Sequence, residues 1–351
     1  MNSRRTAPPG RRGGRSLASA LALGCIVALV AAGCGSAAAT SPAGNSATAS
    51  GSAAVGSPAV GSPAVGSLGP VSLVPGTAVA SAAPSAGFSL VWRDDFEGAA
   101  GSAPSPANWL YDTGPGINFG TGETETMSSS TANIYLDGSG HLAIKPIRAA
   151  DLSWTSGRIE IQRSDFAAPA GGILHVEGSL QQPDVTTANG SGYWPAFWML
   201  GSPLRTGGSW PSVGEIDLME DINGRGSEYG TLHCGSAPGG PCNESSGIGS
   251  GEIPCPDCQT GFHTYAVEYD RSMLPEELRW YLDGKQIFAV KSNQVDATTW
   301  TNATNHGFFI ILNVAVGGGF PVALGGVLLP TTVSGQPMLV DYVAVYTKPV
   351  G

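Results

Sequence analysis

The sequence predicts an all-β fold, a sandwich of two antiparallel sheets, for the part of the chain that begins at Phe88. Short alternating or β-branched segments recur there between Gly, Pro, Asn and Asp residues, as strands do between turns. Asp137-Gly138 and Asp283-Gly284 separate such segments as hairpin turns do. Helical periodicity is nearly absent, and the most helical segment, Pro275–Glu277, is one turn at most.

More than ten strands are expected, which is typical of a large two-sheet sandwich. The expected strands are Phe88–Trp92, Asn133–Leu136, His141–Pro146, Gly157–Gln162, Ile173–Leu180, Trp194–Leu200, Val213–Ile222, Tyr229–His233, His263–Tyr269, Glu277–Leu282, Lys285–Val290, Phe308–Val314 and Met338–Tyr346.

Residues 1–34 have the composition of an export signal. Residues 1–15 hold five arginines and no acid, and Ser16–Val30 is almost wholly apolar, as in a secretory signal. The apolar run is too short to span a membrane convincingly. The stretch that ends at Cys34 resembles a bacterial lipoprotein signal, although Ala31 stands where Leu is usual. We expect an exported bacterial protein, either a surface lipoprotein lipidated at Cys34 or a secreted one.

Residues 35–87 are expected to form a disordered tether, followed by one domain over residues 88–348. No charged residue occurs between Ser16 and Trp92, and Val-Gly-Ser-Pro-Ala repeats within a stretch rich in Ala, Gly, Ser and Pro. Such a composition cannot bury a core. Its expected role is to hold the domain away from a surface, with Cys34 as the only contact with a membrane.

The charge balance disfavours acidic partners. Five of the 17 basic residues lie in residues 1–15, so the rest of the chain has 12 basic and 27 acidic residues, a net charge of −15. Nucleic acid is therefore an unsuitable partner, whereas a neutral polysaccharide remains open.

Four cysteines fall within one Gly- and Pro-rich segment: Cys234, Cys242, Cys255 and Cys258. Such a cluster could hold zinc, but export favours disulfides. Three pairings are possible, and we prefer 234–242 with 255–258. The expected role is to staple a loop, Gly235–Thr260, that has little core of its own.

The stretch Val213–Asp221 is an apolar run that contains the carboxylates Glu215, Asp217 and Glu220. A helix would scatter these three side chains, whereas a strand puts Glu215 and Asp217 on one face. Strict alternation would turn Glu220 to the other face. One extra residue around Leu218–Met219, a β-bulge, would restore it, and bulges often re-aim a side chain next to an active site.

Three carboxylates on one face suit glycoside hydrolysis, which needs a carboxylate opposite the anomeric carbon and an acid at the leaving oxygen. Like charges nearby would raise the pKa of Glu220, as an acid requires. Asp217 is too short to be a second nucleophile but can orient Glu215. A solvated acidic face and a Ca²⁺ site are the alternatives.

Trp194 and Trp198 share one face if Gly192–Leu200 is a strand. Either tryptophan could simply belong to the core. Exposed aromatic rings also stack on the apolar faces of sugars, and a pair just upstream of a carboxylate strand suits a glycan site.

Glu215-Ile-Asp-Leu-Met-Glu220 resembles the signature of glycoside hydrolase family 16 in its bulged form, typical of the laminarinase-like branch. Further similar segments follow in the family's order: Val91–Phe96, Ser156–Ile159, Trp194–Gly201, Phe262–Tyr265, Trp280–Gly284, Phe308–Gly318 and Asp341–Tyr346. The resemblance implies a concanavalin-like jelly-roll sandwich and a retaining endo-β-1,3-glucanase that needs no cofactor for its chemistry.

The resemblance also implies roles for single residues. Glu215 would be the nucleophile, Asp217 its assistant and Glu220 the acid/base. Trp194 and Trp198 would line the donor side, Arg158 would bind the sugar, and His233 would lie beside Glu220 or end a strand as a structural residue. Asp341 and the carbonyl of Gly140 would hold a structural Ca²⁺, unless Asp341 only caps a strand.

Two departures leave specificity open. Gly122–Met127 replaces an Asn-Glu-x-Gln-x-Tyr segment of laminarinases, and the cysteine-bearing insertion follows His233. The expected protein is a monomer that cleaves β-glucan, with β-1,3 or mixed β-1,3/1,4 linkages. The alternatives are a non-catalytic β-glucan-binding protein, an enzyme for another glycan such as a galactan, and a transglycosylase. The presence of both Glu215 and Glu220 disfavours the first.

Overall fold

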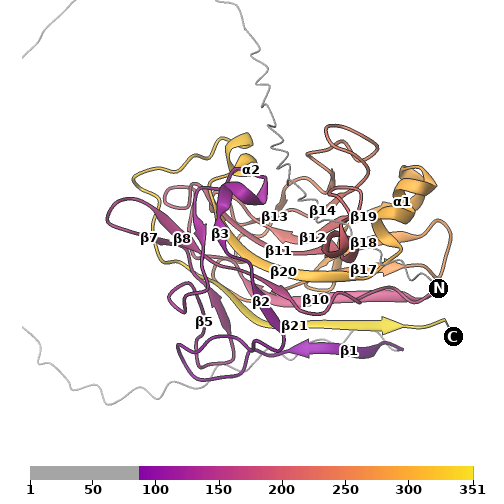
Figure 1. The fold of residues 1–351 in the computed structure, drawn as a ribbon, viewed down its shortest axis with the longest axis horizontal. Coiled ribbons are helices and arrows are strands. Elements are labelled where there is room, and N and C mark those ends of the chain that lie inside the picture. The colour runs from indigo at the N-terminus through magenta and orange to yellow at the C-terminus, as the bar shows by residue number, and fades with distance from the viewer. Residues whose placement is uncertain (1–86, 351) are drawn as a thin grey trace, which may run out of the picture. The chain divides into compact units, whose positions relative to one another are not determined.

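The alternating segments form strands that pair into two large antiparallel sheets (Figure 1), in a computed structural model that describes residues 87–350. The first sheet has the order β19-β18-β17-β10-β21-β6-β5, and β1 also pairs with β21. Its strands are β1 (Ser89–Asp94), β5 (Ile134–Leu136), β6 (Leu142–Ile144), β10 (Ile173–Gln181), β17 (His263–Asp270), β18 (Glu277–Leu282), β19 (Lys285–Lys291) and β21 (Met338–Lys348).

The second sheet has the order β15-β14-β12-β11-β20-β9-β2, and it carries the three carboxylates on β12. Its strands are β2 (Trp109–Tyr111), β9 (Arg158–Ile161), β11 (Tyr193–Gly201), β12 (Glu215–Glu220), β14 (Thr231–His233), β15 (Ile248–Gly249) and β20 (Phe308–Val316). In Figure 1 β20, β11 and β12 lie above β10, β21 and β1. The described residues therefore form the all-β sandwich that the sequence predicts.

Two smaller sheets and five short helices complete the described residues. The small sheets join β3 (Gly114–Pro115), β4 (Thr126–Met127), β8 (Trp154–Ser156) and β7 (Ile147–Arg148), and separately β13 (Ser227–Glu228) and β16 (Ile253–Pro254). The helices are η1 (Gly116–Phe119), η2 (Ser202–Thr206), η3 (Ser292–Gln294), α1 (Ala297–Thr304) and α2 (Gly319–Ala323). None of the helices in residues 87–350 has the length and apolar character that crossing a membrane requires.

The core lies between the two large sheets and fixes the backbone of β12. Phe197 and Ile216 of the second sheet and Trp280 of the first belong to one buried cluster, and each such side chain stabilises the fold by about 1.5–3 kcal/mol. The indole N–H of Trp280 donates to the backbone carbonyl of Asp217 at 2.7 Å. Gly230 permits this packing, because a Cβ there would lie 2.6 Å from the Trp280 ring.

One local prediction was wrong: the most helical segment is not Pro275–Glu277, which forms no helical turn and whose Glu277 begins β18. The longest helix of the described residues is α1, whose N-terminus is capped by Asp296, the acceptor from the backbone N–H groups of Thr298 and Thr299. Because α1 is only eight residues long, a weakly amphipathic, threonine-rich sequence suffices for it and carries little periodic signal.

The two Asp-Gly turns differ. Asp283 and Gly284 make a two-residue hairpin turn with φ of 50° and 74°, as predicted. Asp137 begins a longer loop, because its backbone N–H bonds to the carbonyl of His141. The predicted signal, Cys34 and the tether lie outside the described residues, except for Gly87.

Candidate active site

A β-bulge in β12 gathers the carboxylates. On the neighbouring strand β11, Phe197 pairs with Met219 and Trp198 pairs with Asp217, so Leu218 has no partner. Leu218 and Met219 are both buried, at 1% and 0% exposure, and both belong to the core side. The bulge that the spacing predicted is therefore confirmed, and it turns Glu220 to the face of Asp217.

Glu215 and Asp217 meet the ring of His233, which lies opposite Glu215 on β14. Nε2 of His233 is 3.4 Å from Oδ2 of Asp217 and 3.8 Å from Oε1 of Glu215. A carboxylate oxygen of each acid and a ring nitrogen of His233 all lie within 4.8 Å of one another. The side chain of Glu215 keeps 16% of its surface exposed, so a ligand can reach it.

His233 therefore lies beside Glu215 and Asp217, whereas the resemblance implied a position beside Glu220. Burial lowers the pKa of His233, but the nearby carboxylates of Asp217 and Glu244 outweigh burial and raise it far above its ordinary value. The surrounding carboxylates thus favour the cationic form of the ring, in addition to its place at a strand end.

Glu220 has a different neighbourhood. The indole N–H of Trp194 donates to Oε1 of Glu220 at 2.7 Å, and Trp194 packs edge-on against Phe320, with ring centres 5.8 Å apart. Phe320 in turn packs against Tyr229. Trp194 is thus a direct hydrogen-bond partner of this carboxyl group, a contact that the sequence did not indicate.

Burial and the charge of Asp217 raise the pKa values of both glutamates. For Glu215, nearby His233 and Arg158 oppose the rise. For Glu220, the hydrogen bond from Trp194 is the main opposing influence. Because two cations flank Glu215, we expect it to ionise first, and its charge together with that of Asp217 then keeps the proton on Glu220. Such an arrangement suits a pair of carboxyl groups of which one is ionised and the other protonated.

Trp198 on β11 and Arg158 on β9 lie on the opposite side of β12 from His233. The indole N–H of Trp198 donates to Oδ1 of Asn313 at 2.8 Å. The Arg158 guanidinium lies 4.9 Å from the Trp198 ring centre and 4.6 Å from that of Phe119, and its Nε is 2.8 Å from Asp112. Trp194 and Trp198 are both partly exposed on β11, as a pair of sugar-binding residues requires.

The cysteine-bearing loop reaches back to this site. Cys234 is joined to Cys242 and Cys255 to Cys258, the pairing that we preferred from the sequence. Glu244 within the loop bonds to Nδ1 of His233 at 2.8 Å. Sequence reasoning missed Glu244, because an acid in a Gly- and Ser-rich loop has no periodicity that would connect it with a strand.

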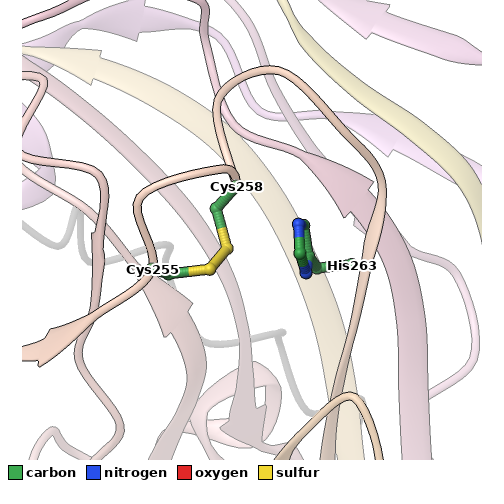
Figure 2. A group of neighbouring side chains, drawn as sticks. All are labelled: Cys255, Cys258 and His263. Carbon is green, nitrogen blue, oxygen red and sulfur yellow. A yellow bond between two sulfur atoms is a disulfide. The ribbon is translucent and has the colours of Figure 1, made fainter.

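Sulfur and nitrogen atoms also converge at the second disulfide. Ligand atoms of Cys255, Cys258 and His263 lie within 4.8 Å of one another, and Figure 2 shows the His263 ring facing the disulfide. The other ring nitrogen, Nδ1, lies 2.7 Å from Asp283. Because the two sulfurs are bonded to each other, they are not free to bind a metal, and the disulfide closes a short turn within the loop, next to the start of β17.

The two residues expected to hold Ca²⁺ come near each other through the pairing of β6 with β21. That ladder ends at Leu142 and Val340, close to Gly140 and directly before Asp341. A carboxylate oxygen of Glu97 also lies next to Gly140, 3.4 Å from where a Cβ would be. Two carboxylates and a carbonyl are ligands that suit Ca²⁺.

The chain is similar to glycoside hydrolases both in sequence and in fold. The family model described as "XgeA-like, catalytic GH16 domain" matches residues 180–258. An endo-1,3-β-glucanase from Streptomyces sioyaensis of known structure is 55% identical, and the match covers 76% of this chain and 99% of that one, with a TM-score of 0.74. An endo-β-1,3-glucanase from Pyrococcus furiosus is 32% identical over 75% of this chain and 96% of that one, with a TM-score of 0.59.

A relative with a longer chain also matches. Glucan endo-1,3-β-glucosidase A1 of Niallia circulans is 32% identical over 288 residues, which cover 75% of this chain and 38% of that protein. The chain thus spans well under half the length of that relative.

Proposed function

The chain belongs to glycoside hydrolase family 16, and from this membership we propose that it is a retaining endo-β-1,3-glucanase of the laminarinase-like branch. Its substrate is a neutral β-glucan such as laminarin. The observation that carries the proposal is the bulged strand β12, which brings Glu215, Asp217 and Glu220 to one face, beside His233 and Trp194.

Two steps use the two glutamates in turn. Glu215 attacks the anomeric carbon and forms a glycosyl-enzyme ester, while Glu220 gives its proton to the leaving glycosidic oxygen. Glu220, now ionised, then takes a proton from water, which attacks the same carbon and releases Glu215. Asp217 and His233 hold Glu215 in orientation, and the net reaction consumes one water molecule for each bond cleaved.

Three other residues of the site bind the glucan. Trp194 and Trp198 offer ring faces to sugar units, and Arg158 offers N–H donors near Glu215. Tryptophans on one strand beside the acids support this assignment. Whether mixed β-1,3/1,4 linkages are also cleaved depends on the subsites around Gly122–Met127.

Incubation of the protein with laminarin, with reducing ends measured over time, tests the proposal. The wild type should release oligosaccharides by internal cleavage, and Glu215→Gln should release none above background. Equal release by the two proteins, or no release by either, would contradict the proposal. A panel of laminarin, lichenan and agarose then tests the linkage, and a preference for agarose would overturn the substrate class. Newly formed longer glucans would indicate a transglycosylase.

We further propose a structural Ca²⁺ held by Asp341, the carbonyl of Gly140 and Glu97. The carboxylate of Glu97 beside Gly140 supports this set. The ion would stabilise the fold and take no part in bond cleavage. Chelation should lower the melting temperature and leave the rate per folded molecule unchanged, whereas an equal melting temperature with and without chelator contradicts the site.

Export and lipidation at Cys34 are proposals that rest on residues 1–34, and a monomeric state is likewise proposed. Mass spectrometry of the mature N-terminus tests the anchor: a diacylglycerol at Cys34 is expected, and an unmodified N-terminus leaves export alone. Sedimentation analysis tests the monomer, which a dimer peak at micromolar concentration contradicts.

A further inference from the structure

Glu244 is a buried carboxylate of the cysteine-bearing loop with two partners. Its side chain is 0% exposed. Oε1 accepts the backbone N–H of Cys234 at 2.8 Å, and Oε2 lies 2.8 Å from Nδ1 of His233. Glu244 also pairs through its backbone with Gly239, and the Cys234–Cys242 disulfide closes the same turn. The loop is therefore built to hold this carboxylate against His233.

Carboxylates face both nitrogens of the His233 ring. Glu244 lies at Nδ1, while Asp217 and Glu215 lie at Nε2, at 3.4 Å and 3.8 Å. Glu220 is the further acid whose charge interacts with the ring. A neutral imidazole has one N–H and would leave one of these carboxylates facing a lone pair. An imidazolium presents an N–H to each side, so carboxylates on both sides of the ring favour the imidazolium.

We propose that Glu244 is a positioning residue, which holds His233 as a fixed imidazolium beside Glu215 and thereby keeps the nucleophile ionised. Glu244 does not touch the substrate and acts only through His233. The ring cation in turn opposes the rise in the pKa of Glu215 that burial and Asp217 cause. This inference rests on the proposed glucanase function and adds a residue that the family signature on β12 does not contain.

A purely structural role for Glu244 is the competing explanation, because Oε1 also satisfies the N–H of Cys234. Glu244→Gln separates the two roles. Glutamine keeps the shape and the carbonyl that accepts from Cys234, but it removes the charge at Nδ1. The matched control is Glu252→Gln in the same loop, because Glu252 is partly exposed and pairs with Arg225 at 2.7 Å.

The pH profile of kcat/KM on laminarin is the first readout. The acidic limb reports ionisation of the nucleophile. Loss of the fixed ring charge should move this limb of Glu244→Gln upward by about 0.5–1 pH unit and lower kcat/KM below the limb by about 3- to 10-fold. Glu252→Gln should keep the wild-type profile. A Glu244→Gln profile that superimposes on that of the wild type overturns the proposal.

The protonation state of His233 is the second readout, and it needs neither substrate nor activity. Protein labelled with ¹⁵N-histidine gives ring nitrogen signals for the five histidines, and the signal missing from a His233→Gln sample belongs to His233. In the wild type at pH 8 both ring nitrogens should be protonated, and in Glu244→Gln the ring should titrate at lower pH.

A neutral His233 ring in the wild type at pH 8 overturns the proposal, and this measurement remains valid if Glu244→Gln fails to fold. If the wild type leaves laminarin intact, the proposed function fails, whereas the nitrogen signals still decide the state of His233. The failures of the two proposals are therefore distinguishable.

Discussion

Replacing Trp194 with phenylalanine should move the alkaline limb of the pH profile to higher pH. The indole N–H donates to Oε1 of Glu220 at 2.7 Å and favours the ionised carboxylate. A hydrogen bond to a charged group contributes about 1.5–3 kcal/mol and one to a neutral group about 0.5–1.5 kcal/mol. The difference, about 1–1.5 kcal/mol, corresponds to about one pKa unit.

The sign follows from the role of Glu220 as an acid. Without the donor, the carboxyl group holds its proton more tightly and its pKa rises, so the acid stays competent at higher pH. Water that enters can replace part of the lost bond, and we therefore expect the alkaline limb of kcat/KM to rise by about 0.5–1 unit. The assay is reducing-end release from laminarin between pH 4 and pH 10.

Trp198→Phe is the matched control, because its indole donates to the neutral side chain of Asn313. Both variants keep an aromatic ring, and both should raise KM. Only Trp194→Phe should shift the alkaline limb. A limb that stays in place in Trp194→Phe, or that shifts equally in the two variants, would refute the assignment of Glu220 as the acid held by Trp194.

Three further predictions concern the bulge, a buried acid and the loop. Deletion of Met219 gives E-x-D-x-E, which still aligns both glutamates, so kcat or linkage preference on laminarin should change while cleavage continues. Glu220→Ala should abolish cleavage. A deletion variant as inactive as Glu220→Ala contradicts this view of the bulge. Glu228 is fully buried and neither carboxylate oxygen has a hydrogen-bond partner, and burial raises its pKa well above the ordinary value. The folded chain therefore keeps Glu228 protonated while the unfolded chain releases the proton, so this group lowers the free energy of unfolding by up to about 1.4 kcal/mol per pH unit above about pH 4.5. In urea titrations Glu228→Gln should be more stable than the wild type at pH 8 but not at pH 4. Equal stability of the two proteins at pH 8 contradicts this prediction. Replacing Cys234 and Cys242 by serine should lower the free energy of unfolding by about 2.5 kcal/mol from loop entropy and move the acidic limb as Glu244→Gln does; an unchanged limb in the folded variant would show that the disulfide does not hold Glu244.

The order and extent of the large strands could be predicted because their signal is local. Glu277–Leu282 was predicted with its observed bounds, and most other strands differ by a few residues at their ends. The bulge was also predictable, since an odd separation between Asp217 and Glu220 cannot share a face on a regular strand. The small sheet of β3, β4, β8 and β7 was missed, because strands of two or three residues carry no period.

The neighbours of the site were less accessible to sequence reasoning. The indole N–H of Trp194 reaches Glu220 from the neighbouring strand β11, and the partner of Nδ1 of His233 is Glu244, eleven residues later in a loop. Both contacts depend on register and loop closure rather than on spacing. Asn313, which accepts from Trp198, lies in the apolar strand β20 and has no sequence signal beyond being the single polar residue there.

The anomeric form of the first product tests the central claim most directly. Proton NMR of a short laminari-oligosaccharide during the first minutes of hydrolysis separates the α and β anomers before mutarotation mixes them. Two displacements, first by Glu215 and then by water, leave the configuration unchanged, so the β anomer should appear first. If the α anomer appears first, hydrolysis takes place in a single displacement by water, and Glu215 is not the nucleophile.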